Sequence, residues 1–337
     1  MKKLINAPEH VVDEMIDGIL AAFPNHLKPT AVSDRGTRGL VVAKAPIEGK
    51  VGIATGGGSG HLPLFLGYLG EGLADGVAIG DVFSSPSAQE MLEVTRAIDS
   101  GNGVLYLYGN YGGDVMNFDM AAEMAEMEGI RVVTSLGADD VASAPPEERE
   151  ARRGIAGIFF AYKLAGAKAA QMASLDEVKR IADKAGENTR TMGVALSPCT
   201  IPAAGVPTFE LGDSEMEIGM GIHGERGVDR GPLKTADEVV DQMLHRVLED
   251  LPFKRNDQVA VLVNGLGATA PSELFIIYRR VAEILKENAI EVHKAFVGEY
   301  ATSMEMKGAS ISLLRLDPEL QSLLDAPCHS PFLLQQI

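Results

Sequence analysis

Two histidines stand among glycines in this sequence, and each could act on a small ligand. His61 ends the run GGGSGH at 56–61, and His223 lies within GMGIHGE at 219–225. Glycine lets a backbone approach a ligand closely, and an imidazole titrates near neutral pH. An imidazole can also act as a nucleophile, and its addition to a ketone would give a hemiaminal, which a plain polyol cannot form. A turn without a ligand at 56–61 and a structural role for His223 remain the alternatives.

Asp114 ends the run YGNYGGD at 108–114 and could serve as a base. This run and the run at 56–61 each follow a predicted strand and precede a predicted helix. Ligands of open α/β sheets bind at the carboxyl ends of strands, where helix N-termini present free N–H groups. A carboxylate and an imidazole at one such edge form a general acid–base pair. Asp114 could instead cap its helix by accepting a backbone N–H.

Common alternatives for a glycine-rich loop do not fit this sequence. It lacks the P-loop pattern, and 56–61 lacks the dinucleotide-binding pattern with its acidic residue. Ser59 is not flanked as in the nucleophile elbow of hydrolases. His61 and His223 have neither HxH nor HExxH spacing, so no metal site is expected.

The elements that must position these residues alternate between strand and helix in the first half of the chain. This rhythm predicts a largely parallel sheet that is covered on both faces. Apolar, β-branched runs predict strands over 40–44, 51–55, 76–80, 103–109 and 130–135, and helical spacing predicts helices over 9–23, 62–70, 86–99 and 115–128.

The second half of the chain begins a new unit after a long helical stretch over 153–188. The part of this stretch that is apolar nearly all round predicts a buried helix, and Ser174 with Glu177 predicts the start of a second one. Further strands are predicted over 191–197, 216–223, 258–265, 290–298 and 310–316, and further helices over 235–249 and 272–287.

The fold class predicted from this pattern is α/β, with two domains. A chain of 337 residues exceeds the size at which one hydrophobic core keeps growing. We expect a first α/β domain over 1–188 and a second over 189–337, each with a largely parallel or mixed sheet flanked by helices. Gly186 and Asn188 interrupt the helical pattern near the expected boundary.

Charge and hydropathy exclude several classes of function. The net charge of −17 argues against nucleic-acid binding, which needs a basic surface. No apolar run is long enough for a membrane helix, and the N-terminus lacks the apolar region of a signal peptide. Cys199 and Cys328 are far apart and fit two reduced thiols, so a cytoplasmic location is expected.

Six ordered blocks, which cover almost the whole chain, resemble the dihydroxyacetone-binding subunit of dihydroxyacetone kinases. The blocks are GGGSGH (56–61), GDVFSSPSA (80–88), NYGGDVMNFDMAAE (110–123), RRGIAG (152–157), CTIPAAGVPTFELGDSEMEIGMGIHGE (199–225) and LVNGLGATAPSEL (262–274). The resemblance implies a homodimer of two-domain subunits, with a ketose site on the first domain and a histidine contributed by the second.

The resemblance also implies a role for each candidate site residue. His223 matches the histidine that binds the C2 carbonyl as a hemiaminal, and His61 the histidine that acts with it on the substrate hydroxyls. Asp114 matches the aspartate that takes the proton from the hydroxyl to be phosphorylated. The backbone that hydrogen-bonds the substrate corresponds to Gly58, Ser59 and Gly60.

The single-chain, ATP-dependent members of this family continue into a helical nucleotide-binding domain, and this sequence has no room for one. The resemblance therefore implies that this chain binds no cofactor itself. A nucleotide-binding kinase subunit is expected to carry ATP or ADP with Mg²⁺. Phosphoenolpyruvate acting through a phosphotransferase system remains an alternative source of the phosphoryl group.

Three positions depart from the family's usual residues, namely Leu62 in place of Glu, Gly109 in place of a substrate-contacting Lys, and Arg226 in place of Pro. The loss of a long side chain at Gly109 suggests room for a four-carbon ketose such as erythrulose. The departures also keep a second hypothesis open, a non-catalytic ketose-sensing co-regulator with the same fold. An unrelated sugar-phosphate enzyme that uses only the glycine loop is a third.

Overall fold

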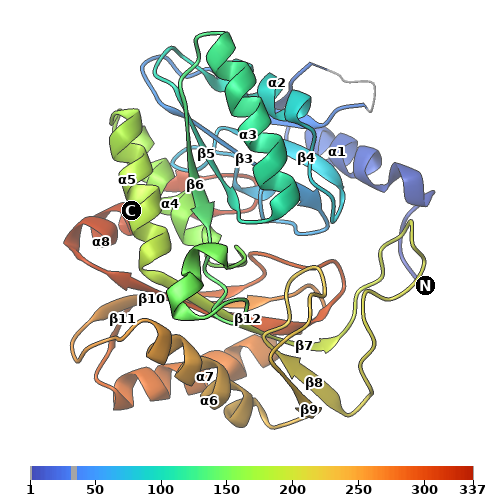
Figure 1. The fold of residues 1–337 in the computed structure, drawn as a ribbon, viewed down its shortest axis with the longest axis vertical. Coiled ribbons are helices and arrows are strands. Elements are labelled where there is room, and N and C mark those ends of the chain that lie inside the picture. Colours follow the sequence, from blue (N-terminus) through green and yellow to red (C-terminus); the bar gives the residue numbers. More distant parts are fainter. Residues whose placement is uncertain (1, 32–35, 337) are drawn as a thin grey trace.

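The computed structural model of the chain, which describes residues 2–31 and 36–336, contains two six-stranded sheets (Figure 1). The first sheet has the order β1-β2-β4-β3-β5-β6, in which β3 to β6 run parallel and β1 and β2 pair antiparallel. Its strands are β1 (Leu27–Pro29), β2 (Gly39–Val42), β3 (Gly52–Ser59), β4 (Gly76–Val82), β5 (Val104–Gly109) and β6 (Val132–Gly137).

The second sheet has the order β11-β10-β12-β7-β8-β9 and is mixed, because only β10 and β11 pair in parallel. Its strands are β7 (Thr189–Ser197), β8 (Glu215–Ile218), β9 (Asp229–Pro232), β10 (Gln258–Gly265), β11 (Glu291–Gly298) and β12 (Lys307–Leu316). A short hairpin, β13 (Cys328–His329) with β14 (Leu334–Gln335), lies near the C-terminus. The predicted fold class, two α/β units with mixed sheets flanked by helices, is confirmed.

The helices form layers on both sheets. In Figure 1, α2 and α3 lie on the first sheet, α4 and α5 lie between the two sheets, and α6 and α7 cover the outer face of the second. No helix within the described ranges is long and apolar enough to cross a membrane. The α-helices are α1 (Val11–Ala22), α2 (Ala88–Ile98), α3 (Gly112–Met127), α4 (Ile158–Ala170), α5 (Leu175–Glu187), α6 (Ala236–Asp250), α7 (Pro271–Glu287) and α8 (Pro318–Asp325), and the 3₁₀ turns are η1 (Pro8–His10), η2 (Leu66–Tyr68) and η3 (Pro146–Ala151).

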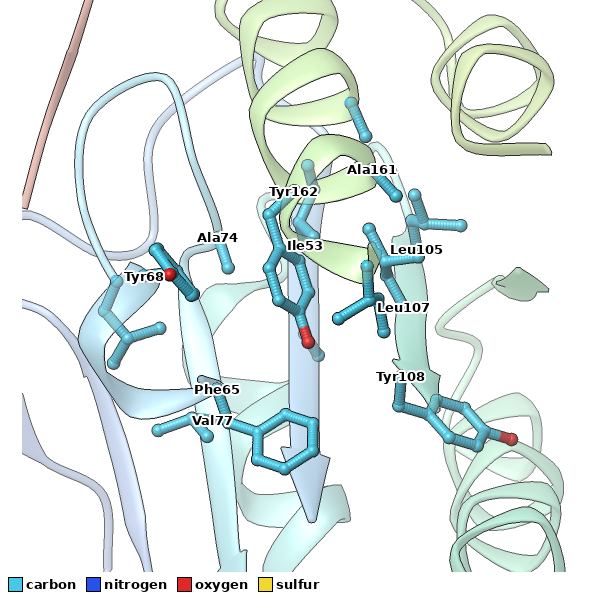
Figure 2. Packing of buried hydrophobic residues seen from close by; sticks show 14 of the residues in the cluster. Ile53, Phe65, Tyr68, Ala74, Val77, Leu105, Leu107, Tyr108, Ala161 and Tyr162 are labelled. Atoms are coloured by element: carbon cyan, nitrogen blue, oxygen red, sulfur yellow. The ribbon is translucent and has the colours of Figure 1, made fainter. Parts of the chain in front are cut away.

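Alternate residues of β3 face different helix layers. Gly56 faces α3, since a Cβ atom there would lie 2.8 Å from the ring of Phe118. Thr55 points the other way, and its hydroxyl lies 2.7 Å from the hydroxyl of Tyr162 in α4. Figure 2 shows Tyr162 next to Ile53 between α4 and the strand. The period of two in a strand therefore places α3 and α4 on opposite faces of the first sheet.

The helix α4 is shared between the two halves of the molecule. Its side chains are buried nearly all round, as the apolar sequence predicts. The ring of Phe159 in α4 lies 5.0 Å from the ring of Phe296 in β11. Helix α8 also packs against α4 from the C-terminal end of the chain. The sheets change at β7, but the domain boundaries at 1–188 and 189–337 stay a prediction, because both halves contribute to this core.

Local sequence patterns were misleading at two places close to the histidines. The helix predicted over 62–70 is wrong, since this segment contains turns and only the short 3₁₀ turn η2. Phe65 takes φ 64°, outside the helical region, and its ring lies where a Cβ on Gly57 would be, at 2.5 Å. The strand predicted over 216–223 ends at Ile218, so His223 lies in a loop. Elsewhere in the chain, the helical stretch predicted over 153–188 begins only at Ile158, with α4.

Candidate functional site

His61 lies just after the end of β3 and is held in one orientation by the other half of the chain. Its Nδ1 lies 2.8 Å from the carbonyl oxygen of Thr302 and must donate to it, because a carbonyl can only accept. The ring stacks on Phe83 with centroids 4.8 Å apart. Burial, and next the charge of His223, lower the pKa of His61 to about 3, so its ring is neutral near pH 7.

His223 comes from the loop after β8 and faces His61. The two Nε2 atoms lie 3.1 Å apart. On its other side, Nδ1 of His223 lies 2.9 Å from Oε1 of Glu225. Burial alone would raise the pKa of Glu225, but the hydrogen bond and charge of His223 outweigh it and lower that pKa to about 2. Glu225 is therefore a carboxylate near neutral pH, and Nδ1 of His223 donates to it.

These contacts fix how protons are distributed between the rings. Both Nδ1 atoms carry a proton, so two neutral rings would turn two Nε2 lone pairs toward each other at 3.1 Å. A hydrogen bond between the Nε2 atoms requires one additional proton. Burial disfavours a charge on His61, whose pKa is lowered, whereas the carboxylate of Glu225 lies against the ring of His223.

Asp114 lies in the first turn of α3, close enough for the charge of His223 to affect it. Its N-cap interpretation is wrong, because Tyr111 occupies the N-cap and Asp114 is the third helical residue. Oδ1 of Asp114 is buried and has no hydrogen-bond partner within the described ranges. Burial raises the pKa of Asp114 to about 6, although Ser85 and His223 oppose the rise. A carboxylate with this pKa is suited to accept a proton near neutral pH.

The glycine segment is the end of a strand rather than the start of a helix. The hydroxyl of Ser59 donates to the carbonyl of Gly80 over 2.7 Å. A Cβ on Gly58 would lie 2.8 Å from Cα of Phe83, and one on Gly60, at φ 103°, would lie 2.7 Å from the ring of Phe83. The expected helix N-terminus is absent here, and the close approach of Phe83 explains these glycines. Contact of 58–60 with a substrate stays a prediction.

The three departures from the family pattern have different surroundings. A Cβ on Gly109 would lie 3.2 Å from both the carbonyl of Gly154 and the ring of Tyr111, so the space beside it is narrow. The carbonyl of Leu62 accepts a hydrogen bond of 2.8 Å from the hydroxyl of Thr302. Arg226 is exposed. The suggestion that Gly109 makes room for a longer ketose stays a prediction.

Sequence reasoning missed several residues that shape the site. Glu225 stands two residues after His223, and this spacing was the one signal that could have found it. Thr302 and Phe83 act through backbone and ring packing and have no local signal. The ring of Tyr111 lies 4.7 Å from that of His223. Within the described ranges, no group of three or more His, Cys, Asp or Glu residues could hold a metal ion.

Comparison with known proteins identifies relatives over almost the whole chain. The Dak1 domain matches residues 17–332. The dihydroxyacetone-binding subunit of PTS-dependent dihydroxyacetone kinase 2 from Listeria innocua is 47% identical over 332 residues, which are 98% of this chain and 99% of that protein. An L-erythrulose 1-kinase from Mycolicibacterium smegmatis is 41% identical over 335 residues, 98% of this chain but 58% of that protein.

A solved structure of a dihydroxyacetone kinase operon co-activator is similar to this chain with a TM-score of 0.89 and 30% identity, covering 96% of this chain and 98% of that one. The resemblance inferred from the six sequence blocks is thus confirmed by a domain match and by full-length relatives. The chain belongs to the dihydroxyacetone kinase family and carries its Dak1 domain.

Proposed function

We propose that this chain is the substrate-holding subunit of a ketose kinase, a phosphotransferase that acts on an alcohol group. The observation that carries the proposal is the pair of Nε2 atoms of His61 and His223, 3.1 Å apart. The buried Oδ1 of Asp114, which has no hydrogen-bond partner among the described residues, lies nearby. Capture and activation of a hydroxyketone need a nucleophile, a group that exchanges a proton with it, and a base. His223, His61 and Asp114 supply these three groups.

Capture begins when Nε2 of His223 attacks C2 of the ketose. For this attack, the proton held between the two rings first moves to Nε2 of His61, which leaves the lone pair on Nε2 of His223 free. His61 then gives the proton to the carbonyl oxygen as the carbon–oxygen double bond becomes single. The product has a hemiaminal hydroxyl and a positive charge on the alkylated ring of His223 beside Glu225. Covalent attachment fixes the substrate and supplies the entropic advantage of a tethered reactant.

Phosphorylation then requires a proton acceptor for the terminal hydroxyl. Asp114 accepts this proton, and the hydroxyl oxygen attacks a phosphoryl group brought by a partner. The bond from phosphorus to the donor breaks, and the donor keeps its electron pair. We propose that the partner is a nucleotide-binding subunit that carries ATP or ADP with Mg²⁺. The name of the Listeria relative, a PTS-dependent kinase subunit, favours a phosphotransferase source over direct use of ATP. A homodimer is part of the proposal, and both cysteines are buried free thiols, which fits a cytoplasmic protein.

The ketose itself is dihydroxyacetone or a four-carbon relative. Calorimetric titration with dihydroxyacetone, both erythrulose enantiomers and glycerol tests this, with a His223→Ala variant alongside. Carbon-13 NMR with ketose labelled at C2 distinguishes a hemiaminal from a bound ketone, because the labelled carbon becomes tetrahedral. We expect a ketose, but not glycerol, to bind covalently to the wild type. We expect the His223→Ala variant to bind neither of them covalently. Equal binding by the variant would overturn the covalent proposal.

A second candidate is a ketose-sensing co-regulator, which the similarity to the operon co-activator favours. Such a protein needs His223 but no base. The two functions separate in a phosphorylation assay with a nucleotide-binding subunit. The kinase proposal requires ketose phosphate to form and to depend on Asp114. The sensor would bind ketose without turnover.

A further inference from the structure

We propose that Glu225 is the positioning residue that holds His223 ready to attack the ketone, and that Arg153 and Asp140 clamp Glu225 in place. This inference rests on the proposed function, because it assigns Glu225 a role in ketose capture. The reacting groups are His61, His223 and Asp114. The residues proposed here support them without touching the substrate.

Both carboxylate oxygens of Glu225 bind the same residue. Oε1 accepts from Nδ1 of His223 at 2.9 Å, and Oε2 accepts from its backbone N–H at 3.0 Å. One contact orients the ring and the other fixes the backbone from which the ring projects. Together they direct Nε2 toward His61 and keep the nucleophilic atom free of the carboxylate.

Glu225 is itself held by residues from the other half of the chain. Nη1 of Arg153 lies 3.9 Å from Oε2 of Glu225. Nη2 of the same guanidinium lies 2.7 Å from Oδ2 of Asp140, and its Nε lies 3.0 Å from that oxygen. Asp140 is only 1% exposed, and its other oxygen accepts the N–H of Ala142 at 3.0 Å. The clamp therefore connects the loop after β6 to the loop that bears His223.

Gly221 leaves the space that this carboxylate occupies. A Cβ atom at position 221 would lie 2.1 Å from Oε2 of Glu225 and 2.7 Å from Nη1 of Arg153. Gly221 is not among the residues with positive φ, so an alanine would suit the backbone and conflict only with these side chains. The absent side chain is thus explained by the position of the carboxylate next to His223.

Capture of a ketone leaves a positive charge on His223, because the ring is an alkylated imidazolium once the hemiaminal has formed. A carboxylate in contact with Nδ1 stabilises this charge. The other titratable or charged groups around His223 come from several elements. Their effects on the charge of His223 remain when Glu225 is changed. They are His61 after β3, Asp114 and Tyr111 at the start of α3, and Arg153 behind Glu225.

Two variants test the positioning role by different routes. Glu225→Gln keeps the shape of the side chain and removes its charge, whereas Gly221→Ala keeps the charge and displaces the carboxylate. The matched control is Glu249→Gln, because Glu249 lies 3.2 Å from Nε2 of His245 in an exposed pair on α6, away from the site. Ketose affinity and the fraction of C2-labelled ketose present as hemiaminal are measured for each protein between pH 5 and 8, and circular dichroism confirms folding.

We expect both variants to bind the ketose about 10- to 100-fold more weakly near pH 7, the range for loss of one charge-assisted hydrogen bond. In Glu225→Gln, the fraction of C2-labelled ketose present as hemiaminal should also fall, because the positively charged adduct loses its counter-charge. If His223→Ala loses capture but Glu225→Gln keeps the affinity and pH profile of the wild type, the positioning role alone is overturned. Unchanged capture in His223→Ala would instead overturn the proposed function.

Discussion

Nδ1 of His61 donates a hydrogen bond of 2.8 Å to the carbonyl oxygen of Thr302, a residue 241 positions further along the chain. Thr302 follows β11 of the second sheet, while His61 follows β3 of the first. The reverse relation holds for His223, which is carried by the second half and whose partner Glu225 is clamped by Arg153 of the first. Each half of the chain therefore orients the histidine that the other half carries. The site forms only when the halves pack together.

Replacement of His61 by Asn should weaken ketose capture without removing the nucleophile. The variant loses the ring nitrogen that accepts the proton from His223, and we expect affinity to fall about 10- to 100-fold, as for a lost hydrogen bond to a charged group. Calorimetry measures the change, and His245→Asn, whose side chain is 70% exposed, is the control. Affinity equal to that of the wild type would contradict the role of His61 in the proton transfer.

Replacement of Asp114 by Asn should separate binding from turnover. The amide cannot take the proton from the hydroxyl, so we expect ketose capture to remain while phosphorylation with the partner subunit falls by at least about 100-fold, the usual contribution of a general base. Parallel calorimetry and turnover measurements test this. Loss of both activities together would indicate that Asp114 holds the ketose rather than activates it.

The pH dependence of turnover should also depend on Asp114. Its pKa is raised to about 6 by burial, and only the carboxylate form can act as a base, so kcat/KM should fall as the pH drops below about 6. His61 cannot cause this fall, because its pKa is lowered to about 3 and its ring stays neutral throughout the range. A pH–rate profile that is flat between pH 5 and 7 would exclude Asp114 as the base.

The sequence predicted the parts of the site that depend on strand order. Runs of alternating strands and helices predicted a parallel sheet, and His61 and Asp114 follow β3 and β5, which are neighbours in that sheet. The contacts that orient the site could not be predicted, since they join distant segments. Thr302 acts through its backbone, and Phe83, at φ 56°, packs against both histidine rings through tertiary contacts. Phe65 illustrates the same limit, because its packing against Gly57 outweighs the helical pattern of 62–70.

Asp250 should be essential for the packing of the two halves. It accepts two hydrogen bonds from Arg152, at 2.8 and 2.5 Å, and another from Arg190, and all three side chains are at least nine-tenths buried. Asp250→Ala leaves two buried guanidinium groups without a counter-charge, and we expect the free energy of unfolding to fall by about 3–5 kcal/mol. The exposed pair of Asp237 with Arg279 is the control, where Asp237→Ala should cost less than about 1 kcal/mol.

The contribution of Asp250 should disappear in acid. Burial alone would raise its pKa, but the hydrogen bonds and charges of Arg152 and Arg190 outweigh it, and the pKa is lowered in the fold. The stabilisation is therefore complete above the unfolded value near 4 and is lost as the pH falls through the folded value. Urea unfolding at pH 7 and in acid, with the wild type and Asp250→Ala compared, measures this. A difference that grows on acidification would contradict it.

Lys163 should destabilise the fold near neutral pH, although it makes a hydrogen bond. Its side chain is fully buried in α4, and Nζ donates to the carbonyl of Leu323 in α8 over 3.0 Å. Burial lowers its pKa from 10.5 to about 8. Below pH 8 both the folded and the unfolded chain hold the proton, so the fold carries the full cost of the buried charge. Between pH 8 and 10.5 the folded chain releases the proton first, and this cost decreases as the pH rises.

The variant Lys163→Met should therefore be more stable than the wild type at pH 7, by about 2 kcal/mol once the lost hydrogen bond is subtracted from the cost of the shift. The gain should shrink at pH 9, where the wild type has already lost the proton in its folded state. Urea midpoints at the two pH values measure both effects, and Lys44→Met at a residue with 78% side-chain exposure is the control. A less stable variant at pH 7 would mean that the bond to Leu323, which joins α4 to α8, outweighs the cost of burying the charge.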